Sequence, residues 1–325
     1  MVTVAEEYDV AVIGGGAAGL SAAVALGRSR RSVVVIDAGE PRNAPADGVH
    51  GFLSRDGVPP AELLATGRAE AARYGVELRA GLAVDARPVA GGFEVTLDPA
   101  AAAGRSAVRA RRIVVATGLV DELPDVAGLR ERWGRDVVHC PYCHGWEVRD
   151  EPIGVLGGHP RAVHVVQLFR QLSPDVVLFT HTGPAPSEAE LEELAARDVR
   201  VVPGVVTAVE VTGDRLSGVR LADGTVVPRR ALAVGTRLVA RSAVLEGLGV
   251  RATPDPSGVG DRIEADPTGR TAVDGVWVAG NVTNLMAQVV VAAAGGLMAG
   301  AAVNADLAAE DTRDAVAARR ERLAS

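Results

Sequence analysis

The sequence predicts an α/β protein made of two similar three-layer units, of which the second is inserted into the first. A strand, a glycine-rich turn, a helix and a second strand follow one another between Tyr8 and Asp37, and the same order returns after Pro152. Such self-similarity along a chain is the signature of a duplicated structural unit. The last third of the chain carries no glycine-rich turn of its own, so we expect it to return and complete the first unit.

The first glycine-rich turn, Gly14-Gly15-Gly16-Ala17-Ala18-Gly19, follows the apolar run Val10 to Ile13. A single G-x-G-x-x-G is weak evidence, but here a predicted strand precedes it and a predicted helix follows it. In this arrangement Gly14 allows the tight turn, Gly16 lets the backbone approach a pyrophosphate, and Gly19 lets the helix pack on the strand. The turn therefore predicts a Rossmann-like dinucleotide-binding unit.

The helix after this turn and the acidic residue after the next strand complete the pattern. The helix begins near Ala17 and Ala18, where free N–H groups and the positive end of the helix dipole favour phosphate. The strand Val33 to Ile36 ends on Asp37. We expect its carboxylate to accept hydrogen bonds from the ribose hydroxyls of an adenosine.

The remaining elements of the first unit are predicted from the periodicity of apolar residues. The basic run Arg109 to Arg112 is expected to be solvated, at the start of a strand. The predicted elements are a helix at Glu62–Tyr74, strands at Phe93–Leu97 and Ala107–Ala110 with a Pro/Ala/Gly loop between them, and a buried strand from Arg111 that ends in the turn Ala116-Thr117-Gly118.

The second unit repeats this order and is followed by the last third of the chain. That third carries Gly275 to Asn281 and the apolar stretch Val289 to Val303, which is too short to span a bilayer, so we expect a buried helix. The elements predicted for the second unit are a strand at Ile153–Leu156, a turn at Gly157–Ala162, a helix at Val163–Leu172, a strand at Val176–Phe179, a meander through Val205–Val211, Leu216–Leu221 and Thr225–Val227, and a closing segment at Arg229–Gly235.

Composition excludes several classes of function. The net charge is −7 and the basic residues are scattered, so nucleic acid is not an expected partner. Every basic residue is Arg, which excludes a pyridoxal Schiff base and a Walker-type phosphate lysine. Glu6, Glu7 and Asp9 before the first strand are the reverse of a secretory or transit peptide. With only two cysteines as well, we expect a cytoplasmic protein without a membrane partner.

Both cysteines of the chain lie in Cys140-Pro141-Tyr142-Cys143, directly before His144. A C-x-x-C at a helix start with an imidazole beside it lowers a cysteine pKa and supplies the thiolate that disulfide exchange requires. A zinc site is one alternative, but His139 and His144 lie too close to the cysteines to surround one ion tetrahedrally. A static disulfide is another, but it would close almost no loop entropy. The motif therefore predicts redox chemistry and no metal site.

The glycine fingerprint, the C-x-x-C in a duplicated middle unit and a late Ala279-Gly280-Asn281 segment resemble the low-molecular-weight thioredoxin reductase family. The resemblance covers essentially the whole chain. It implies a two-domain flavoprotein that binds FAD and forms a homodimer. Residues 1–119 and 238–325 would form a discontinuous FAD domain, and residues 120–237 an inserted NADPH-type domain that carries the dithiol.

The same resemblance implies roles for residues at the flavin. Cys143 would be the sulfur next to the flavin, and Cys140 the sulfur that exchanges with the substrate. Asn281 stands where the family usually has an Asp that hydrogen-bonds to the FAD ribityl chain, and an amide can make that bond without the charge. Gln288 and Val289 would open the C-terminal helix under the flavin pyrimidine, where the helix dipole stabilises the reduced ring. The residues expected to hold FAD are Gly14, Gly16, Ala17, Ala18, Gly19, Asp37, Ala116, Thr117, Gly118, Gly280, Asn281, Gln288 and Val289.

The second glycine turn departs from the family's NADPH-binding pattern. His159 stands where the middle glycine of a G-G-G-x-x-A turn lets the pyrophosphate approach, and Pro160 removes an N–H from the helix start. After the next strand, Thr180-His181-Thr182-Gly183 stands in place of the arginines that clamp a 2′-phosphate. Losing two charge-assisted contacts costs roughly 3 kcal/mol or more, which is on the order of a hundredfold in affinity. We therefore expect that NADPH is not a substrate.

His144 is the other departure, because reductases of the family place an Asp after the second cysteine as proton donor. A histidine with a pKa near neutrality is suited to take a proton from an incoming thiol, while packing for shape is the alternative. The string from His139 to Gly145 is similar to the dithiol oxidases that close disulfides in gliotoxin- and holomycin-type natural products, which also lack a working NADPH site. His50 is a further histidine that could reach the flavin edge.

Together these observations predict an FAD-dependent dithiol oxidase that forms a disulfide in a small dithiol and passes the electrons to O₂, giving H₂O₂. One alternative is a disulfide reductase of the same fold that uses NADPH in an atypical way or a ferredoxin. A second alternative is a flavin-loaded redox sensor that binds a protein partner. Both a small cyclic molecule and a small protein stay open as the dithiol.

Overall fold

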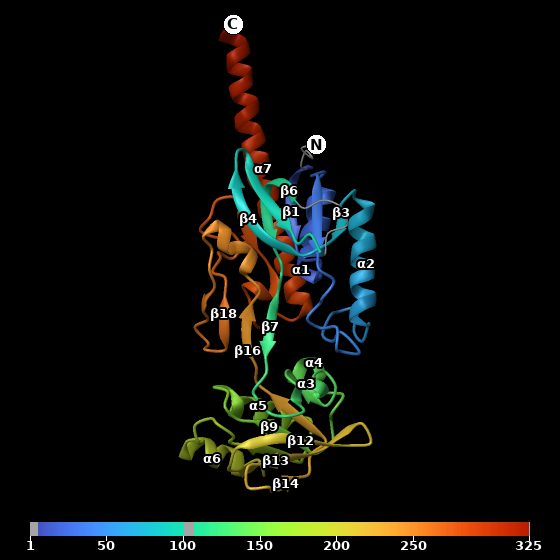
Figure 1. The fold of residues 1–325 in the computed structure, drawn as a ribbon, viewed down its shortest axis with the longest axis vertical. Helices are drawn as coiled ribbons and strands as arrows, with labels where there is room; N and C mark the ends of the chain where they lie inside the picture. Colours follow the sequence, from blue (N-terminus) through green and yellow to red (C-terminus); the bar gives the residue numbers. More distant parts are fainter. Residues whose placement is uncertain (1–5, 101–106, 325) are drawn as a thin grey trace.

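The structure, a computed structural model, describes residues 6–100 and 107–324. The predicted α/β class is confirmed, because the described chain forms two lobes that each contain a largely parallel sheet with helices against it (Figure 1). Two extended strands join the lobes, β7 (Leu119–Glu122) and β16 (Arg237–Ala240), and they pair with each other antiparallel. The domain boundaries predicted after residues 119 and 237 fall at the starts of these strands, and the boundaries themselves stay a prediction.

The first lobe is built on a seven-stranded sheet of order β3-β2-β1-β6-β5-β4, with β19 paired to β6. The Val/Ile runs of β1 and β2 are buried, as central strands of a parallel sheet require. Because β19 comes from the last third of the chain, that segment does return to the first sheet. The strands are β1 (Glu7–Ile13), β2 (Val33–Asp37), β3 (Glu77–Ala80), β4 (Ala83–Val89), β5 (Gly92–Leu97), β6 (Ala107–Val115) and β19 (Val276–Val278).

Two local predictions are corrected in this lobe. The strands expected separately at Ala107–Ala110 and from Arg111 onward are the single strand β6, because β1 pairs with it from Arg109 to Val115. The helix expected at Glu62–Tyr74 is α2 (Pro60–Arg73), which starts earlier because proline suits the first helical position. Part of the loop predicted before β6 lies outside the described residues.

The helices α1 (Ala17–Arg28) and α7 (Val289–Ala324) pack tightly against each other through small residues. A Cβ at Gly296 would lie 1.9 Å from the carbonyl oxygen of Ala18, so only glycine allows this approach. The helix predicted to be buried and to end at Val303 is only partly buried, because one side of it packs on α1 and leaves Val291, Leu297 and Met298 exposed. It is also longer than expected, at 36 residues. It continues because the sequence after that position is rich in Ala and contains neither Gly nor Pro.

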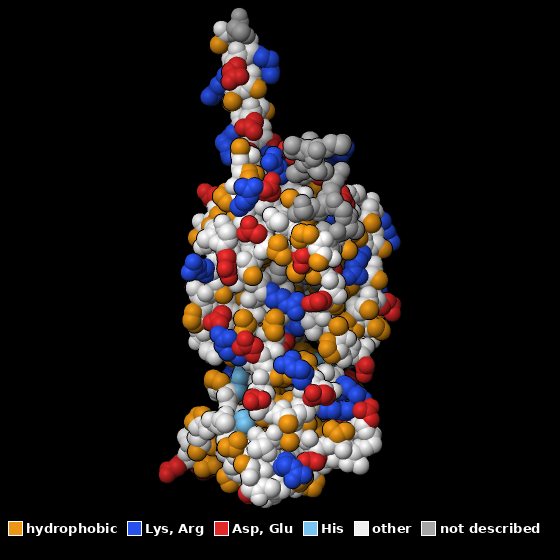
Figure 2. Space-filling model, in the orientation of Figure 1, with side chains coloured by type: hydrophobic (Ala, Val, Ile, Leu, Met, Phe, Trp, Pro, Cys, Tyr) orange, Lys and Arg blue, Asp and Glu red, His pale blue; other side chains and the backbone are white. Residues whose placement is uncertain are grey.

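The end of α7 projects beyond the first lobe (Figure 1), and basic, acidic and apolar side chains alternate on the projecting part (Figure 2). By length and composition alone α7 qualifies as a membrane-spanning helix, so the expected absence of a membrane partner stays a prediction.

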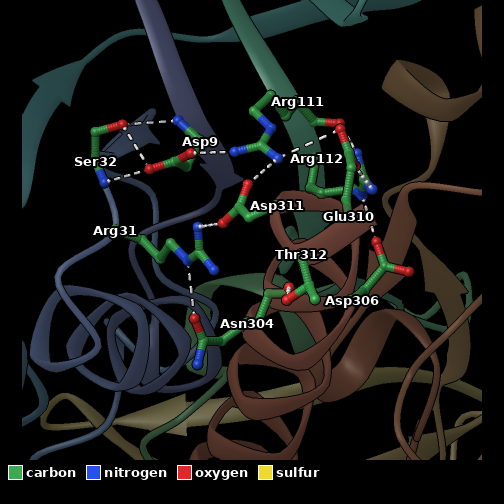
Figure 3. Close-up of polar contacts among 11 residues, drawn as sticks. Asp9, Arg31, Ser32, Arg111, Arg112, Asn304, Asp306, Glu310, Asp311 and Thr312 are labelled. Atoms are coloured by element: carbon green, nitrogen blue, oxygen red, sulfur yellow. Dashed lines mark hydrogen bonds and ion pairs between the residues drawn. The ribbon is translucent and has the colours of Figure 1, made fainter. Parts of the chain in front are cut away.

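A cluster of ion pairs ties the middle of α7 to the first sheet (Figure 3). Arg111 donates to Asp9 at 2.9 Å and to Asp311 at 2.6 Å, and Arg112 donates to Asp306 at 2.6 Å. The two arginine side chains are 28% and 14% exposed. The expectation of a solvated basic run is therefore wrong for these two residues, because α7 brings a row of acidic side chains onto the end of the strand.

The second lobe has a parallel sheet of order β11-β10-β9-β15-β8 and a separate antiparallel meander. A glycine turn follows β9 as the first follows β1, which agrees with the predicted duplication. The helix expected at Val163–Leu172 is shorter, at Ala162–Phe169. The elements are β8 (Val137–Val138), β9 (Ile153–Leu156), α5 (Ala162–Phe169), β10 (Val176–Phe179), α6 (Glu188–Ala195), β11 (Arg200–Val202), β12 (Val206–Thr212), β13 (Arg215–Leu221), β14 (Val226–Val227) and β15 (Ala231–Val234).

Short elements complete the region between the lobes. The strands β17 and β18 extend the β7–β16 pair into a four-stranded sheet. Helices α3 and α4 lie on the side of the second lobe that faces the first (Figure 1). Their bounds are α3 (Leu129–Arg132), α4 (Pro141–His144), η1 (Ala243–Leu248), β17 (Thr253–Pro254), β18 (Gly260–Arg262) and η2 (Gly280–Val282).

Candidate active site

A cavity of about 1000 Å³ is lined by residues of both lobes, a size at the upper end for ligand pockets. In Figure 2 the molecule narrows between the lobes, and histidine side chains lie at this waist. The cavity brings together every predicted site residue except Gly19, which packs behind the turn. The predicted site residues that line it are Gly14, Gly16, Ala17, Ala18, Asp37, Ala116, Thr117, Gly118, Cys140, Cys143, His144, Gly280, Asn281, Gln288 and Val289.

The first glycine turn has the geometry of a phosphate-binding turn. Gly14 has a φ of +105°, and a Cβ there would lie 2.5 Å from the carbonyl oxygen of Ala116. A Cβ at Gly19 would lie 1.8 Å from the carbonyl oxygen of Gly14, which is the close helix–strand packing that the sequence predicts. A Cβ at Gly16, in contrast, would meet no heavy atom within 4 Å. The backbone at Gly16 is therefore open to a pyrophosphate.

Asp37 lies beside this turn at the end of β2. Its Oδ1 accepts a hydrogen bond from the backbone N–H of Gly15 at 3.1 Å, and its Oδ2 accepts one from Arg68 at 3.3 Å. Gly15 is required here because a Cβ would lie 2.7 Å from Cγ of Asp37. The carboxylate is thus oriented at the cavity wall, with lone pairs left to accept ribose hydroxyls.

Two further segments of the cavity wall, around Thr117 and around Gly280, are held in place by close contacts. Thr117 donates its hydroxyl to the carbonyl of Arg241 at 2.5 Å, which fixes the turn after β6. Gly280 has a φ of +76°, and a Cβ there would lie 2.8 Å from Cβ of Ala18. The late segment is therefore pressed against the start of α1. These features fit a dinucleotide laid from the glycine turn toward the start of α7.

The two cysteines lie on the part of the wall that the second lobe contributes. Cys140 is the N-cap of α4, with Pro141 at the first helical position, and both thiols are free in the structure. A hydrogen bond with the Cys143 thiol lowers the pKa of Cys140 to about 7, helped by the backbone N–H of Tyr142. The same pairing, together with burial, raises the pKa of Cys143 above its usual range. In the dithiol form, Cys140 is therefore the sulfur that ionises first.

Arg42, which the sequence analysis does not single out, also lines the cavity. It forms a bidentate ion pair with Asp121 at 2.6 and 2.7 Å, and its charge acts to lower the pKa of both cysteines. Burial alone would raise the pKa of Asp121, but hydrogen bonds from Arg42 and Thr236 hold it below its ordinary range. No motif marks this arginine, because only the folding of its loop against β7 brings it near the sulfurs.

His144 ends α4 and lines the same cavity. Both ring nitrogens are buried, and neither has a hydrogen-bond partner among the residues that the structure describes. Burial lowers the pKa of His144 below its usual range, while the charge of Glu147 opposes this shift. A neutral imidazole has one ring nitrogen that can accept a proton. A buried polar group without a partner calls for an explanation, and a catalytic role is one.

His50 lines the cavity from the first lobe. Its Nε2 lies 3.5 Å from Oε1 of Glu147 on the second lobe, and its Nδ1 lies 3.5 Å from Oδ2 of Asp56. The side chain therefore bridges the lobes. A contact between His50 and a flavin stays a prediction.

The second glycine turn is filled by its own side chain. Nδ1 of His159 accepts a hydrogen bond from the backbone N–H of Arg161 at 3.1 Å, which is a donor at the start of α5 that would otherwise face a phosphate. The ring packs against Gly235, where a Cβ would lie 2.4 Å from Cγ of the histidine. Burial lowers the pKa of His159, so the ring is neutral near pH 7. His159 thus takes the place that a pyrophosphate would need.

The loop after β10 packs against the second glycine turn. Gly183 packs on Gly158, since a Cβ on Gly183 would lie 2.4 Å from the backbone nitrogen of Gly158. His181 has a φ of +50°, and its Nδ1 accepts a backbone N–H.

The chain is similar to two fungal proteins along nearly its whole length. It is 31% identical to thioredoxin reductase tcpT of Claviceps purpurea, over 93% of this chain and 95% of that protein. It is also 31% identical to thioredoxin reductase sirT of Leptosphaeria maculans, over 95% of this chain and 98% of that protein.

Solved structures and a family model agree with these relatives. The crystal structure of HlmI has a TM-score of 0.87 with this chain at 46% identity, and 97% of each chain is covered. An oxidoreductase from Agrobacterium tumefaciens has a TM-score of 0.85 at 37% identity, over 93% of this chain and 98% of that chain. Residues 8–296 match the model of the pyridine nucleotide-disulphide oxidoreductases. The chain therefore belongs to the pyridine nucleotide-disulphide oxidoreductase family, as a disulfide oxidoreductase of the thioredoxin-reductase-like kind.

Proposed function

We propose that the protein is an FAD-dependent dithiol oxidase, which converts a small dithiol into a disulfide and passes the electrons to O₂ to give H₂O₂. One observation carries the proposal: the glycine turn of the first lobe is open to the cavity, whereas His159 fills that of the second. With the second glycine turn filled, the dithiol beside the open site is the proposed entry point for electrons. The likeness of His139–Gly145 to the dithiol oxidases and the similarity to HlmI also support it.

The side chains of the second lobe perform the exchange. His144 takes the proton of a substrate thiol, and the resulting thiolate attacks Sγ of Cys140 in the disulfide form. Cys143 leaves as a thiolate. Its raised pKa depends mainly on Cys140, so this cause is removed once Cys140 is in the mixed disulfide, and Arg42 then favours the anion. The second substrate thiolate displaces Cys140, releasing the product disulfide and leaving two electrons in the cysteine pair.

The cofactor would be held by the first glycine turn, by Asp37 and by the segments around Thr117 and Asn281. Members of this family are typically flavoproteins. When bound, FAD supplies the group that takes two electrons from the cysteine pair and hands them to O₂.

The Gly16→Val variant is expected to lose the flavin and to keep its fold. A side chain there projects into space that the pyrophosphate needs, while the extended backbone of Gly16, with φ −76° and ψ −174°, accepts valine. Flavin absorbance of the purified variant and its far-UV circular dichroism measure the two effects. Gly19→Ala is the contrasting variant and should lose thermal stability, because its Cβ would clash with Gly14. Full flavin occupancy in Gly16→Val would place the cofactor elsewhere.

Oxygen uptake with dithiothreitol as the dithiol tests the proposed reaction. We expect one O₂ consumed and one H₂O₂ formed for each dithiol oxidised, with no requirement for NADPH. The names of the fungal relatives keep a disulfide reductase as the alternative. Negligible oxygen uptake together with NADPH-dependent reduction of an aromatic disulfide would establish that alternative instead.

A further inference from the structure

We propose that Asn281 is a positioning residue, which fixes the turn before α7 and keeps this part of the cavity wall uncharged, so that the bound flavin is easier to reduce. The inference rests on the proposed FAD site and deepens it. It explains why an amide stands at a position where a carboxylate would also fit by size.

The backbone holds Asn281 firmly at the cavity. It is the second residue of η2, directly after Gly280, which packs on Ala18 at the start of α1. The side chain lines the cavity, and the turn that follows it leads through Gln288 into α7.

The amide nitrogen of Asn281 binds this turn. Nδ2 donates to the carbonyl oxygens of Asn284 at 3.1 Å, Leu285 at 3.3 Å and Ala287 at 2.9 Å. Three carbonyl oxygens around one atom define its identity, because only the NH₂ end of an amide can face them. Oδ1 of Asn281 has no hydrogen-bond partner among the described residues, which leaves it available to a ligand group in the cavity.

An ionised Asp has acceptors only, so it could not bind these three carbonyl oxygens and would turn its charge toward the cavity instead. The turn would then lose the donor that holds the path of the chain into Gln288 and the first residue of α7. Asparagine therefore serves both as a donor and as a neutral group.

The absence of charge has a consequence for electron transfer. A negative charge beside a cofactor opposes the addition of electrons, and this repulsion is strong in a partly buried site. A neutral Asn281 thus shifts the equilibrium between dithiol and flavin toward the reduced flavin. That direction suits an enzyme that draws electrons out of its dithiol substrate.

The test compares the flavin midpoint potential of the intact holoprotein with those of Asn281→Asp, Asn281→Ala and Asn284→Asp. The potential is read by photoreduction against a reference dye, with no dithiol or O₂ present. Asn284→Asp is the matched control, since it adds the same charge on an exposed side chain of the same turn that does not line the cavity. The dissociation constant for FAD is measured in parallel.

We expect Asn281→Asp to shift the flavin equilibrium at least tenfold toward the oxidised form, which is about 30 mV for a two-electron couple. Asn284→Asp should leave the potential unchanged. Asn281→Ala removes the donor without adding charge, so it should release FAD at least tenfold more readily. Wild-type potential in Asn281→Asp, or wild-type FAD affinity in Asn281→Ala, would overturn the inference. Failure of the wild-type protein to bind FAD would instead contradict the proposed function.

Discussion

Replacing either Cys140 or Cys143 by Ser is expected to reduce dithiol oxidation to background, and the two variants should differ in their flavin spectra. Cys140→Ser removes the sulfur that the substrate attacks and also the partner that raises the pKa of Cys143. The remaining Cys143 thiolate beside the oxidised flavin should therefore give a long-wavelength charge-transfer band. Oxygen uptake and visible spectra recorded against pH measure both effects.

The assignment of the two sulfurs has an independent check in the wild-type protein. In the reduced enzyme, alkylation by iodoacetamide should modify Cys140 with a midpoint at about pH 7, because its pKa is lowered to about 7, while Cys143 should react far more slowly. A charge-transfer band in Cys143→Ser and none in Cys140→Ser would reverse the two roles.

The His144→Ala variant is expected to slow reduction of the enzyme by its dithiol by roughly 10²–10⁴-fold, the usual contribution of one general base. The imidazole accepts a proton only when it is neutral. Because burial lowers its pKa, the wild-type rate should rise with pH below the usual histidine range and level off above it. The sequence alone predicts this rise near neutrality, and the structure moves it to lower pH. Stopped-flow reduction under anaerobic conditions measures the profile.

Two further variants distinguish proton transfer from packing at this position. His144→Gln keeps a hydrogen bond but cannot carry the proton, so it should be nearly as slow as His144→Ala. His164→Gln, which changes an exposed histidine of α5, should behave like the wild type. The rate of enzyme reduction by substrates whose thiols are already ionised should be much less affected by either substitution of His144. Near-normal reduction rates in His144→Gln from pH 6 to 9 would assign the residue to packing.

Features that depend on short stretches of sequence could be predicted well. The turn at Gly14–Gly19 is specified by steric limits at individual glycines, and the structure shows close approaches at Gly14 and Gly19 and open space at Gly16. The return of the last third to the first sheet could also be predicted, since that segment has no phosphate-binding turn of its own. The filling of the second glycine turn by His159 could be predicted as well, because it depends only on the size of that side chain.

Features that depend on contacts between distant segments could not be predicted. Nothing in the sequence near Arg42 indicates that its loop packs against Asp121 and acts on the cysteines. The basic residues Arg111 and Arg112 look solvated until α7 brings acidic side chains to them. The three carbonyl contacts of Asn281 likewise arise only when the turn before α7 has folded back. Each is set by tertiary packing rather than by local pattern.

One anaerobic titration tests the central claim, that electrons enter this flavoprotein from a dithiol and not from a nicotinamide. The oxidised holoprotein is titrated first with NADPH and then with dithiothreitol, while the flavin absorbance is followed. We predict that NADPH bleaches the flavin slowly or not at all, because His159 and the loop Thr180–Gly183 close its site, and that the dithiol then bleaches it fully. Rapid, stoichiometric bleaching at micromolar NADPH would contradict the account and identify a reductase.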